Sequence, residues 1–384
     1  MHGLIDTTLR EGAQTVGVSF DLAAARAMVD GLVAVGVEEI ELGWAAAQAE
    51  RLAPLLAHAR RRSPATRLAL WCRCLKADIR QAAALGPDVL ALSLPVSDRH
   101  LVTRLGRSRE WAVAALEEAV AEARRSGGQI LALGLEDATR ADEPFLLAVA
   151  ERAATLGVQR LRLADTVGVA SPARIAGLIR RLAAVPCQLA VHTHNDFGMA
   201  TANAVAALEA GAAWADVTVL GLGERAGLAR LEEVAAFAAL HWGRAYDLAA
   251  LAPLCRTVAA AAGSAIPPAH PVVGERVFAC ETGLHLQGLY ADPATYEPFP
   301  PERVGGQRRL LLGAKAGRRA VAAALSRLGR PVANPELASL TGALRRLAGH
   351  LHRPLSDAEL LAAAGQTGPH EARCGTGEPC PRPG

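Results

Sequence analysis

The sequence predicts an α/β fold, a (β/α)₈ TIM barrel followed by a smaller, mostly helical C-terminal lid region. Along most of the chain, an Ala- and Leu-rich helical stretch, a glycine-containing connector and a short apolar run follow one another repeatedly. Eight apolar runs alternate with helical patterns over about 240 residues, as expected for a closed parallel barrel. Polar residues recur at or just past the ends of these runs, and in this fold that face carries the chemistry.

The eight runs place the strands, with helices in the intervals. We expect strands near residues 3–6, 39–43, 67–72, 88–93, 129–135, 160–164, 188–193 and 215–220. A doubly wound open sheet is the alternative architecture. No Gly-x-Gly-x-x-Gly pattern follows the first predicted strand, which argues against a dinucleotide-binding fold of that kind.

Changes in composition predict the domain boundaries. We expect a catalytic barrel, a linker, an accessory or lid region and a disordered tail, over residues 1–245, 246–272, 273–365 and 366–384. The linker contains the Pro-rich stretch 265–271, and the tail is rich in Gly, Pro and polar residues. A helical pattern over 335–350 makes the accessory region helical.

Composition excludes several classes of partner. The net charge is only +3 at pH 7 and no basic run occurs, so we expect neither nucleic acid nor a membrane surface as partner. Charged residues or glycine interrupt the apolar stretches well before transmembrane length. The chain opens directly into a predicted strand, and its seven cysteines lack a disulfide framework spacing. We therefore expect no signal peptide, reduced thiols and a cytoplasmic location.

Two histidines and one carboxylate predict a metal site. His192 and His194 lie two residues apart in one predicted strand, so their imidazoles point to the same side. Glu11 follows the first predicted strand and reaches the same end of the barrel. Two imidazoles and a carboxylate with open positions suit a catalytic divalent ion, namely Mg²⁺, Mn²⁺, Zn²⁺, Co²⁺ or Fe²⁺. The alternative is a pair of histidines hydrogen-bonded at the barrel rim.

Neighbouring residues after the first strand supply charge and an amide. Arg10 lies next to Glu11, and a guanidinium near a metal can stabilise an oxyanion that develops on a substrate carbonyl. A surface ion pair between Arg10 and Glu11 is the alternative. Gln14 offers an amide contact to the substrate.

Other polar residues end later strands. Glu136 ends the fifth strand and is either an acid or base or a residue of a helix cap or salt bridge. Thr166 lies in the segment Asp165–Gly168, whose composition also suits a plain turn. Arg73 ends the third strand. The Gly-rich loop Gly221–Gly227 can cradle an anion or serve only as a flexible turn.

Together these motifs resemble the DRE-TIM metallolyases, and within them the 2-isopropylmalate and homocitrate synthases. The matching segments are Asp6–Gln14, His192–Asp196 and Gly221–Gly227. The resemblance covers about residues 3–320. Further segments are most similar to the homocitrate synthases of nitrogen fixation, namely Leu70–Arg73, Ser93–Asp98, Glu136–Asp142 and Ala164–Val169.

The resemblance implies a reaction and a cofactor. It implies homocitrate synthase activity, an acyl transfer in which acetyl-CoA condenses with 2-oxoglutarate and releases homocitrate and CoA. Homocitrate would then serve the nitrogenase metal cluster. One divalent ion (Mg²⁺, Mn²⁺, Zn²⁺ or Co²⁺) would bind Glu11, His192 and His194, and it would hold the keto acid by its 1-carboxylate and keto oxygen.

The same resemblance implies roles for the other candidates. Arg10 would stabilise the alkoxide, and Glu136 would take part in proton transfer. Gln14, Arg73 and Thr166 would bind the substrate. His285 matches a lid histidine that reaches the active site of the neighbouring subunit, which implies a homodimer.

The chain also departs from the family pattern. Leu228 stands where several relatives have an asparagine that binds the metal. Cys280 replaces a histidine of the lid motif, and Lys315 is displaced by one position within another. Three rival interpretations therefore stay open: a synthase for pyruvate or 2-ketoisovalerate, a non-catalytic paralogue that only binds ligand, and an iron oxygenase.

Overall fold

The computed structural model describes residues 1–365. The disordered tail expected over 366–384 lies outside the described residues. The chain divides into two compact units. The first comprises Met1–Val277 with Arg303–Gly305, and the second comprises Phe278–Glu302 with the described residues from Gly306 onward. Each unit is described by itself.

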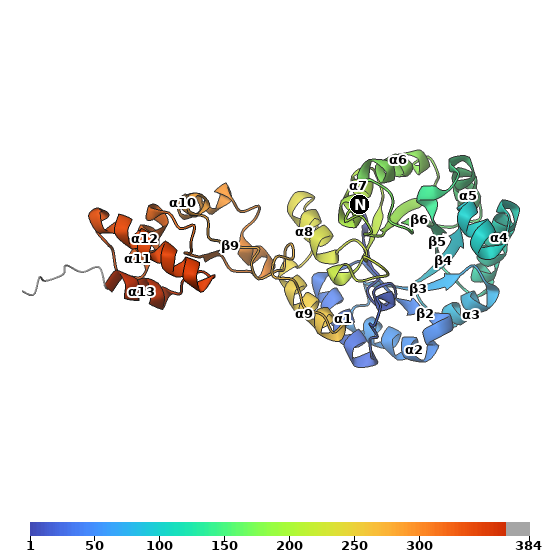
Figure 1. Cartoon of the computed structure of the whole chain (residues 1–384). Coiled ribbons are helices and arrows are strands. Elements are labelled where there is room, and N and C mark those ends of the chain that lie inside the picture. Colours follow the sequence, from blue (N-terminus) through green and yellow to red (C-terminus); the bar gives the residue numbers. More distant parts are fainter. Residues whose placement is uncertain (366–384) are drawn as a thin grey trace, which may run out of the picture. The chain divides into compact units, whose positions relative to one another are not determined.

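The first unit is a closed barrel of eight parallel strands (Figure 1), which confirms the predicted fold class. Each strand pairs with the next along the chain, and β8 closes the barrel by pairing with β1. The strands are β1 Gly3–Asp6, β2 Glu39–Trp44, β3 Arg67–Arg73, β4 Val89–Pro95, β5 Ile130–Glu136, β6 Arg160–Asp165, β7 Gln188–Thr193 and β8 Trp214–Val217.

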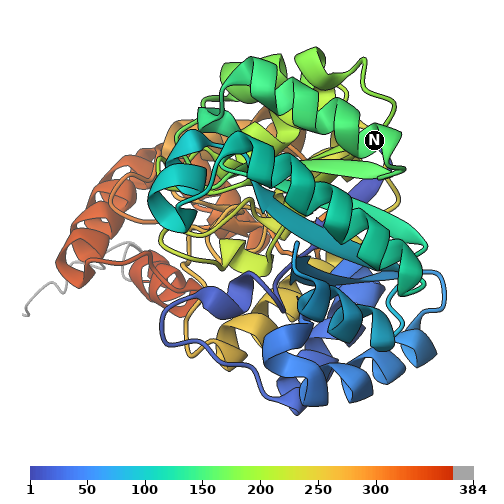
Figure 2. The same ribbon diagram turned by 90° about the vertical axis from the view of Figure 1, so that its right-hand side faces the viewer.

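Helices surround the strands, and Figure 2 shows members of this outer ring running alongside the sheet. They are α1 Leu22–Val35, α2 Ala45–Arg62, α3 Lys76–Ala84, α4 Arg109–Arg125, α5 Glu143–Thr155, α6 Pro172–Leu182, α7 Ala200–Glu209, α8 Leu231–His241 and α9 Leu251–Ala261. Several start at a residue whose side chain accepts a hydrogen bond from a backbone N–H of the first turn, namely Asp21, Ser108, Asp142 and Ser171. Within residues 1–365 no helix is both long and apolar enough to cross a membrane.

Strand β8 ends three residues before the predicted limit of 220, and side chains explain why. The hydroxyl of Thr8 accepts a hydrogen bond from the backbone N–H of Val219 at 2.8 Å, and the carboxylate of Glu232 accepts one from Leu220 at 3.0 Å. Leu220 takes a positive φ of 59°. Since these N–H groups bond to side chains, the chain leaves the sheet here and starts the Gly-rich loop.

The segment 246–272 differs from the expected linker. It contains α9, which packs against α1 inside the first unit. Leu251, Leu254 and Val258 are buried on that helix. Three apolar residues at helical spacing bury one face against the barrel, so the compact unit continues to Val277.

The second unit is mostly helical, as predicted. Its helices are α10 Gly283–Ala291, α11 Arg318–Arg327, α12 Asn334–Leu351 and α13 Asp357–Gly365. A short parallel pair joins β9 Ala279–Cys280 to β10 Arg309–Leu310. An apolar core of its own includes Leu286, Val321 and Leu340.

Candidate metal and substrate site

Three side chains from the C-terminal ends of β1 and β7 meet at one point. Glu11 follows β1, His192 lies in β7, and His194 comes just after it. All three are buried, and one potential ligand atom from each lies within 4.8 Å of the others. The predicted grouping of Glu11, His192 and His194 is therefore present in the structure.

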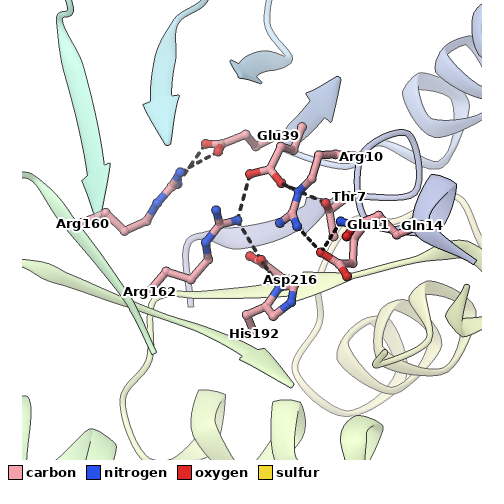
Figure 3. A network of polar contacts seen from close by, with 10 residues as sticks. Thr7, Arg10, Glu11, Gln14, Glu39, Arg160, Arg162, His192 and Asp216 are labelled. Carbon is pink, nitrogen blue, oxygen red and sulfur yellow. Dashed lines mark hydrogen bonds and ion pairs between the residues drawn. The ribbon is translucent and has the colours of Figure 1, made fainter. Parts of the chain in front are cut away.

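The two imidazoles are prepared as metal ligands. His192 Nδ1 lies 2.7 Å from a carboxylate oxygen of Asp216 (Figure 3), which leaves Nε2 of His192 for an ion. His194 Nδ1 is buried without a hydrogen-bond partner in the described part of the chain. Burial, and then the charge of His192, lowers the pKa of His194 to about 2, so its ring is neutral at pH 7. A buried imidazole with an unpaired nitrogen, in a cluster that also holds a carboxylate, fits a divalent ion.

Arg10 is held next to this cluster. Its Nε donates to Glu41 at 2.5 Å, and its Nη1 pairs with Glu11 (Figure 3). Burial alone would lower the pKa of Arg10, but Glu41 and Glu11 raise it, so the guanidinium stays charged. Gln14 Nε2 donates to Glu11 at 3.0 Å. Arg10 is thus an oriented, permanent cation beside the candidate ligands.

A cavity of about 410 Å³ opens at this cluster. Most predicted site residues line it: Arg10, Glu11, Gln14, Glu136, Thr166, His192 and His194. Residues that the sequence did not single out for this site line it too, among them Trp44, Trp71, Arg104 and Arg162. The cavity is therefore the candidate substrate pocket.

Glu136 and Thr166 face the cavity with defined partners. The carboxylate of Glu136 accepts a hydrogen bond from Ser93 Oγ at 2.7 Å and one from Arg104 at 2.5 Å. The hydroxyl of Thr166 accepts from the backbone N–H of Asp137 at 2.8 Å. Because a hydroxyl can accept and donate at once, Thr166 keeps its proton for a substrate oxygen.

Two predicted site residues are placed elsewhere. Arg73 does not line the cavity: its guanidinium binds Asp78 through two hydrogen bonds of 2.7 and 3.0 Å and lies 4.9 Å from the ring centre of Trp44. His285 belongs to α10 of the second unit, where its ring packs on Tyr296 at 4.3 Å. Roles for Arg73 and His285 in substrate binding and catalysis stay predictions.

The residues that sequence reasoning missed come from two sources. Arg104 ends a π-helical turn, Arg99–Arg104, after β4, and nothing local in the sequence marks it. Glu41, Arg162 and Asp216 are buried charged residues inside barrel strands. Such buried charges at strand positions were the signal that could have found this second group.

Leu228 occupies the position where the family resemblance predicts a metal-binding asparagine. It is buried, and its backbone pairs with His194. A Cβ built on Gly223 would lie 2.3 Å from Leu228 Cδ1 and 3.7 Å from Glu11 Cγ, so the side chains of Leu228 and Glu11 both lie next to Gly223.

We expect Leu228→Asn to tighten divalent-metal binding, since an amide oxygen would then lie near Glu11. Chelator competition measures this, with Leu231→Asn as control; equal affinity in wild type and Leu228→Asn would contradict the expectation.

Comparison with known proteins agrees with this geometry. The HMGL-like family model matches residues 2–258, two thirds of the chain. The chain belongs to the HMGL-like family. A second model, described as homocitrate synthase post-HMGL domain-like, matches residues 272–351 of this HMGL-like protein. The resemblance to the DRE-TIM metallolyases is thereby confirmed.

Relatives at substantial identity are synthases. Homocitrate synthase from Frankia alni is 44% identical over 84% of this chain and 93% of its own. Homocitrate synthase 1 from Nostoc sp. is 40% identical over 93% and 95%. A 2-phosphonomethylmalate synthase from Streptomyces rubellomurinus is 39% identical over 85% and 88%.

Solved structures agree on the fold. A hydroxymethylglutaryl-CoA lyase from Pseudomonas aeruginosa superposes with a TM-score of 0.61 at 24% identity, covering 68% of this chain and 93% of the lyase. That likeness shows the fold alone. With its homocitrate synthase relatives and its HMGL-like barrel, this HMGL-like protein is a condensing, acyl-transferring enzyme. The family is divalent-metal dependent, in agreement with the cluster of Glu11, His192 and His194.

Proposed function

We propose that this enzyme is a homocitrate synthase that condenses acetyl-CoA with 2-oxoglutarate and releases homocitrate and CoA. The observation that carries the proposal is one cavity bordered by Glu11, His192, His194 and the cation Arg10. The homocitrate synthase relatives support the same substrates. Citramalate and isopropylmalate synthases are also similar, so the keto acid is the point to be tested.

Glu11, His192 and His194 would hold one divalent ion, Mg²⁺, Mn²⁺, Zn²⁺ or Co²⁺. When bound, such an ion supplies Lewis acidity toward a keto oxygen and a template for an adjacent carboxylate. Two imidazoles and a carboxylate do not select one of these metals. Metal identity is therefore an outcome of the experiment below.

Part of the cavity lining suits a second carboxylate, as in 2-oxoglutarate. Ser93 and Arg104 both line it. The side chain of Arg104 is half exposed, and its partner Glu136 occupies one of its nitrogens, Nη2. A guanidinium has five N–H donors, so Arg104 can bind a substrate carboxylate without releasing Glu136. Pyruvate and 2-ketoisovalerate carry no second carboxylate for it.

We assign the steps of the reaction to individual residues of the cavity. Thr166 donates to a carboxylate oxygen of the keto acid, and Glu136 takes part in removing a proton from the methyl group of acetyl-CoA. The methyl carbon forms a bond to the keto carbon while Arg10 stabilises the negative charge on the former keto oxygen. That oxygen takes up a proton, which balances the one removed from the methyl group. Water then cleaves the thioester, which releases homocitrate and the CoA thiol.

We also propose the biological setting and the assembly that the sequence resemblance implies. Homocitrate from this enzyme would serve nitrogenase cofactor synthesis. The enzyme would be a homodimer, with His285 acting in the active site of the partner subunit. Size-exclusion chromatography with light scattering tests the dimer: a monomeric mass in an active preparation contradicts it.

A keto-acid panel tests the substrate assignment. The metal-loaded enzyme receives acetyl-CoA with 2-oxoglutarate, pyruvate, 2-ketoisovalerate or phosphonopyruvate, and a thiol reagent measures free CoA. We expect the highest kcat/KM with 2-oxoglutarate. Omission of the keto acid controls for plain thioester hydrolysis.

Each other result contradicts the proposal in its own way. A higher kcat/KM with pyruvate or 2-ketoisovalerate would make the enzyme a citramalate or isopropylmalate synthase. A higher value with phosphonopyruvate would equally contradict the homocitrate assignment. Tight 2-oxoglutarate binding without CoA release under any metal would make it a binding paralogue. Oxygen-dependent consumption of 2-oxoglutarate without CoA release would favour the oxygenase interpretation.

A further inference from the structure

A chain of buried charges links the two halves of the site. It consists of Arg10, Glu41, Arg162, Asp216 and His192, and we call it the floor network. Arg162 Nη1 donates to Glu41 at 2.9 Å and to Asp216 at 2.8 Å. Glu41 in turn accepts from Arg10, and Asp216 contacts His192 Nδ1 at 2.7 Å (Figure 3). Arg162 is therefore the centre of a path from the oxyanion-stabilising cation to a metal ligand.

Arg162 is a charged residue buried in the interior of the barrel. Its side chain is only 5% exposed, and it points into the interior of the barrel, where branched apolar residues usually fill the layers. Burying a charge is costly unless it is paired. Arg162 meets that condition with two carboxylates, each of which already holds a group of the active site.

The opposite charges in the floor network keep Glu41 and Arg162 ionised. Burial alone would raise the pKa of Glu41, but the guanidinium groups of Arg10 and Arg162 outweigh it and hold that pKa well below its usual range. Burial would lower the pKa of Arg162, yet Asp216 and Glu41 raise it. Arg162 and Glu41 thus stay ionised, and their contacts are charge-assisted hydrogen bonds, which are short and directional.

We propose that Arg162 is a positioning residue that orients Arg10 through Glu41 and His192 through Asp216. This role for Arg162 rests on the proposed homocitrate synthase function and adds a residue that supports it. By fixing both carboxylates at once, Arg162 sets the distance between the metal ligand and the cation that stabilises the developing oxyanion. Without it, Glu41 and Asp216 lose their common partner, and both Arg10 and His192 lose their support.

The chain offers a matched control on the same strand. Arg160 lies two residues earlier in β6, faces the same interior and is equally buried, with a 4% exposed side chain. It binds Glu39 on β2 through two hydrogen bonds of 2.9 and 2.5 Å (Figure 3). Neither Arg160 nor Glu39 lines the cavity. Loss of Arg160 therefore breaks a buried ion pair of the same kind without touching the floor network.

The experiment compares Arg162→Met with Arg160→Met in the full chain. Thermal unfolding measures stability, chelator competition measures the affinity for Mn²⁺ and Co²⁺ without substrate, and CoA release gives kcat and KM. We expect both variants to unfold at lower temperature. Only Arg162→Met should lose metal affinity, by about 10-fold, the lower end of the loss that follows removal of a group in direct contact with a ligand, because Arg162 acts through Asp216. Its kcat should fall with little change in the KM for acetyl-CoA.

A conservative variant separates positioning from folding. Arg162→Lys keeps one charged nitrogen, and a single nitrogen of Arg162 makes both contacts. We therefore expect Arg162→Lys to recover most of the metal affinity and kcat. Equal metal affinity and kcat in Arg162→Met and Arg160→Met would overturn the proposal. So would failure of both Arg162 variants to fold while Arg160→Met folds, because Arg162 would then serve folding alone.

The experiment distinguishes failure of the role of Arg162 from failure of the homocitrate synthase assignment. Metal affinity is measured without a keto acid, so it reports on Arg162 whichever substrate the enzyme prefers. If the wild type rejects 2-oxoglutarate, the homocitrate assignment fails, and kcat is then measured with the keto acid that the panel selects. If the wild type makes homocitrate and Arg162→Met binds metal normally, only the role of Arg162 fails.

Discussion

Replacing Glu11 or His192 by alanine is expected to abolish divalent-metal binding and CoA release together. Each residue contributes one of the clustered ligand atoms, which lie within 4.8 Å of one another. Removing a supporting partner of a metal ligand typically costs 10- to 100-fold in affinity, so loss of a ligand itself should cost more than about 100-fold. Chelator competition and the CoA assay measure the two losses on the same protein.

A histidine outside the cluster provides the control for this prediction. His58 pairs with Asp30, and neither residue lines the cavity, so His58→Ala should keep full metal affinity. The prediction would be contradicted by a Glu11→Ala protein that binds metal like the wild type. It would also be contradicted by His192→Ala with unchanged kcat at saturating metal.

Arg10→Ala is expected to keep the metal and lose about 10²- to 10³-fold in kcat. One preorganised donor to a developing oxyanion is worth about 3 kcal/mol. Within residues 1–365, Nε and Nη1 of Arg10 are taken by Glu41 and Glu11, which leaves Nη2 to donate to the substrate. Steady-state kinetics with saturating metal give kcat, and chelator competition gives the affinity.

Arg10→Lys sharpens the same test. Lysine keeps the charge but has no planar fork that binds Glu11, Glu41 and substrate at once. We therefore expect Arg10→Lys to recover only a small part of the lost kcat. A near wild-type kcat in Arg10→Ala would rule out the oxyanion role. A large rise in KM with unchanged kcat would make Arg10 a substrate-binding residue instead.

The barrel could be predicted because its signals are local. Apolar runs and glycine connectors placed all eight strands to within a few residues. The end of β8 could not be predicted, since it depends on Thr8, which is 211 residues away from Val219 in sequence. The helix α9 was missed because the Pro-rich stretch after it led us to expect a linker from residue 246 onward.

In the candidate site, too, some residues could be predicted from local sequence and others depend on contacts between distant residues. His192 and His194 follow from strand periodicity, and Glu11 follows from its place after β1. Arg162 and Glu41 are 121 residues apart, and Arg162 and Asp216 are 54 apart. A single sequence does not pair such distant residues. The family resemblance also predicts that Arg73 binds substrate; the structure pairs its guanidinium with Asp78 away from the cavity lining, and that role stays a prediction.

The most direct test of the central claim is to identify the product by mass spectrometry. The purified enzyme is freed of metal with a chelator, and one half is reconstituted with Mn²⁺ or Co²⁺. Both halves then receive acetyl-CoA and 2-oxoglutarate. We predict homocitrate in the reconstituted sample, and none in the metal-free sample or in Glu11→Ala. Homocitrate formed equally without metal, or no homocitrate with any divalent ion, would contradict the account.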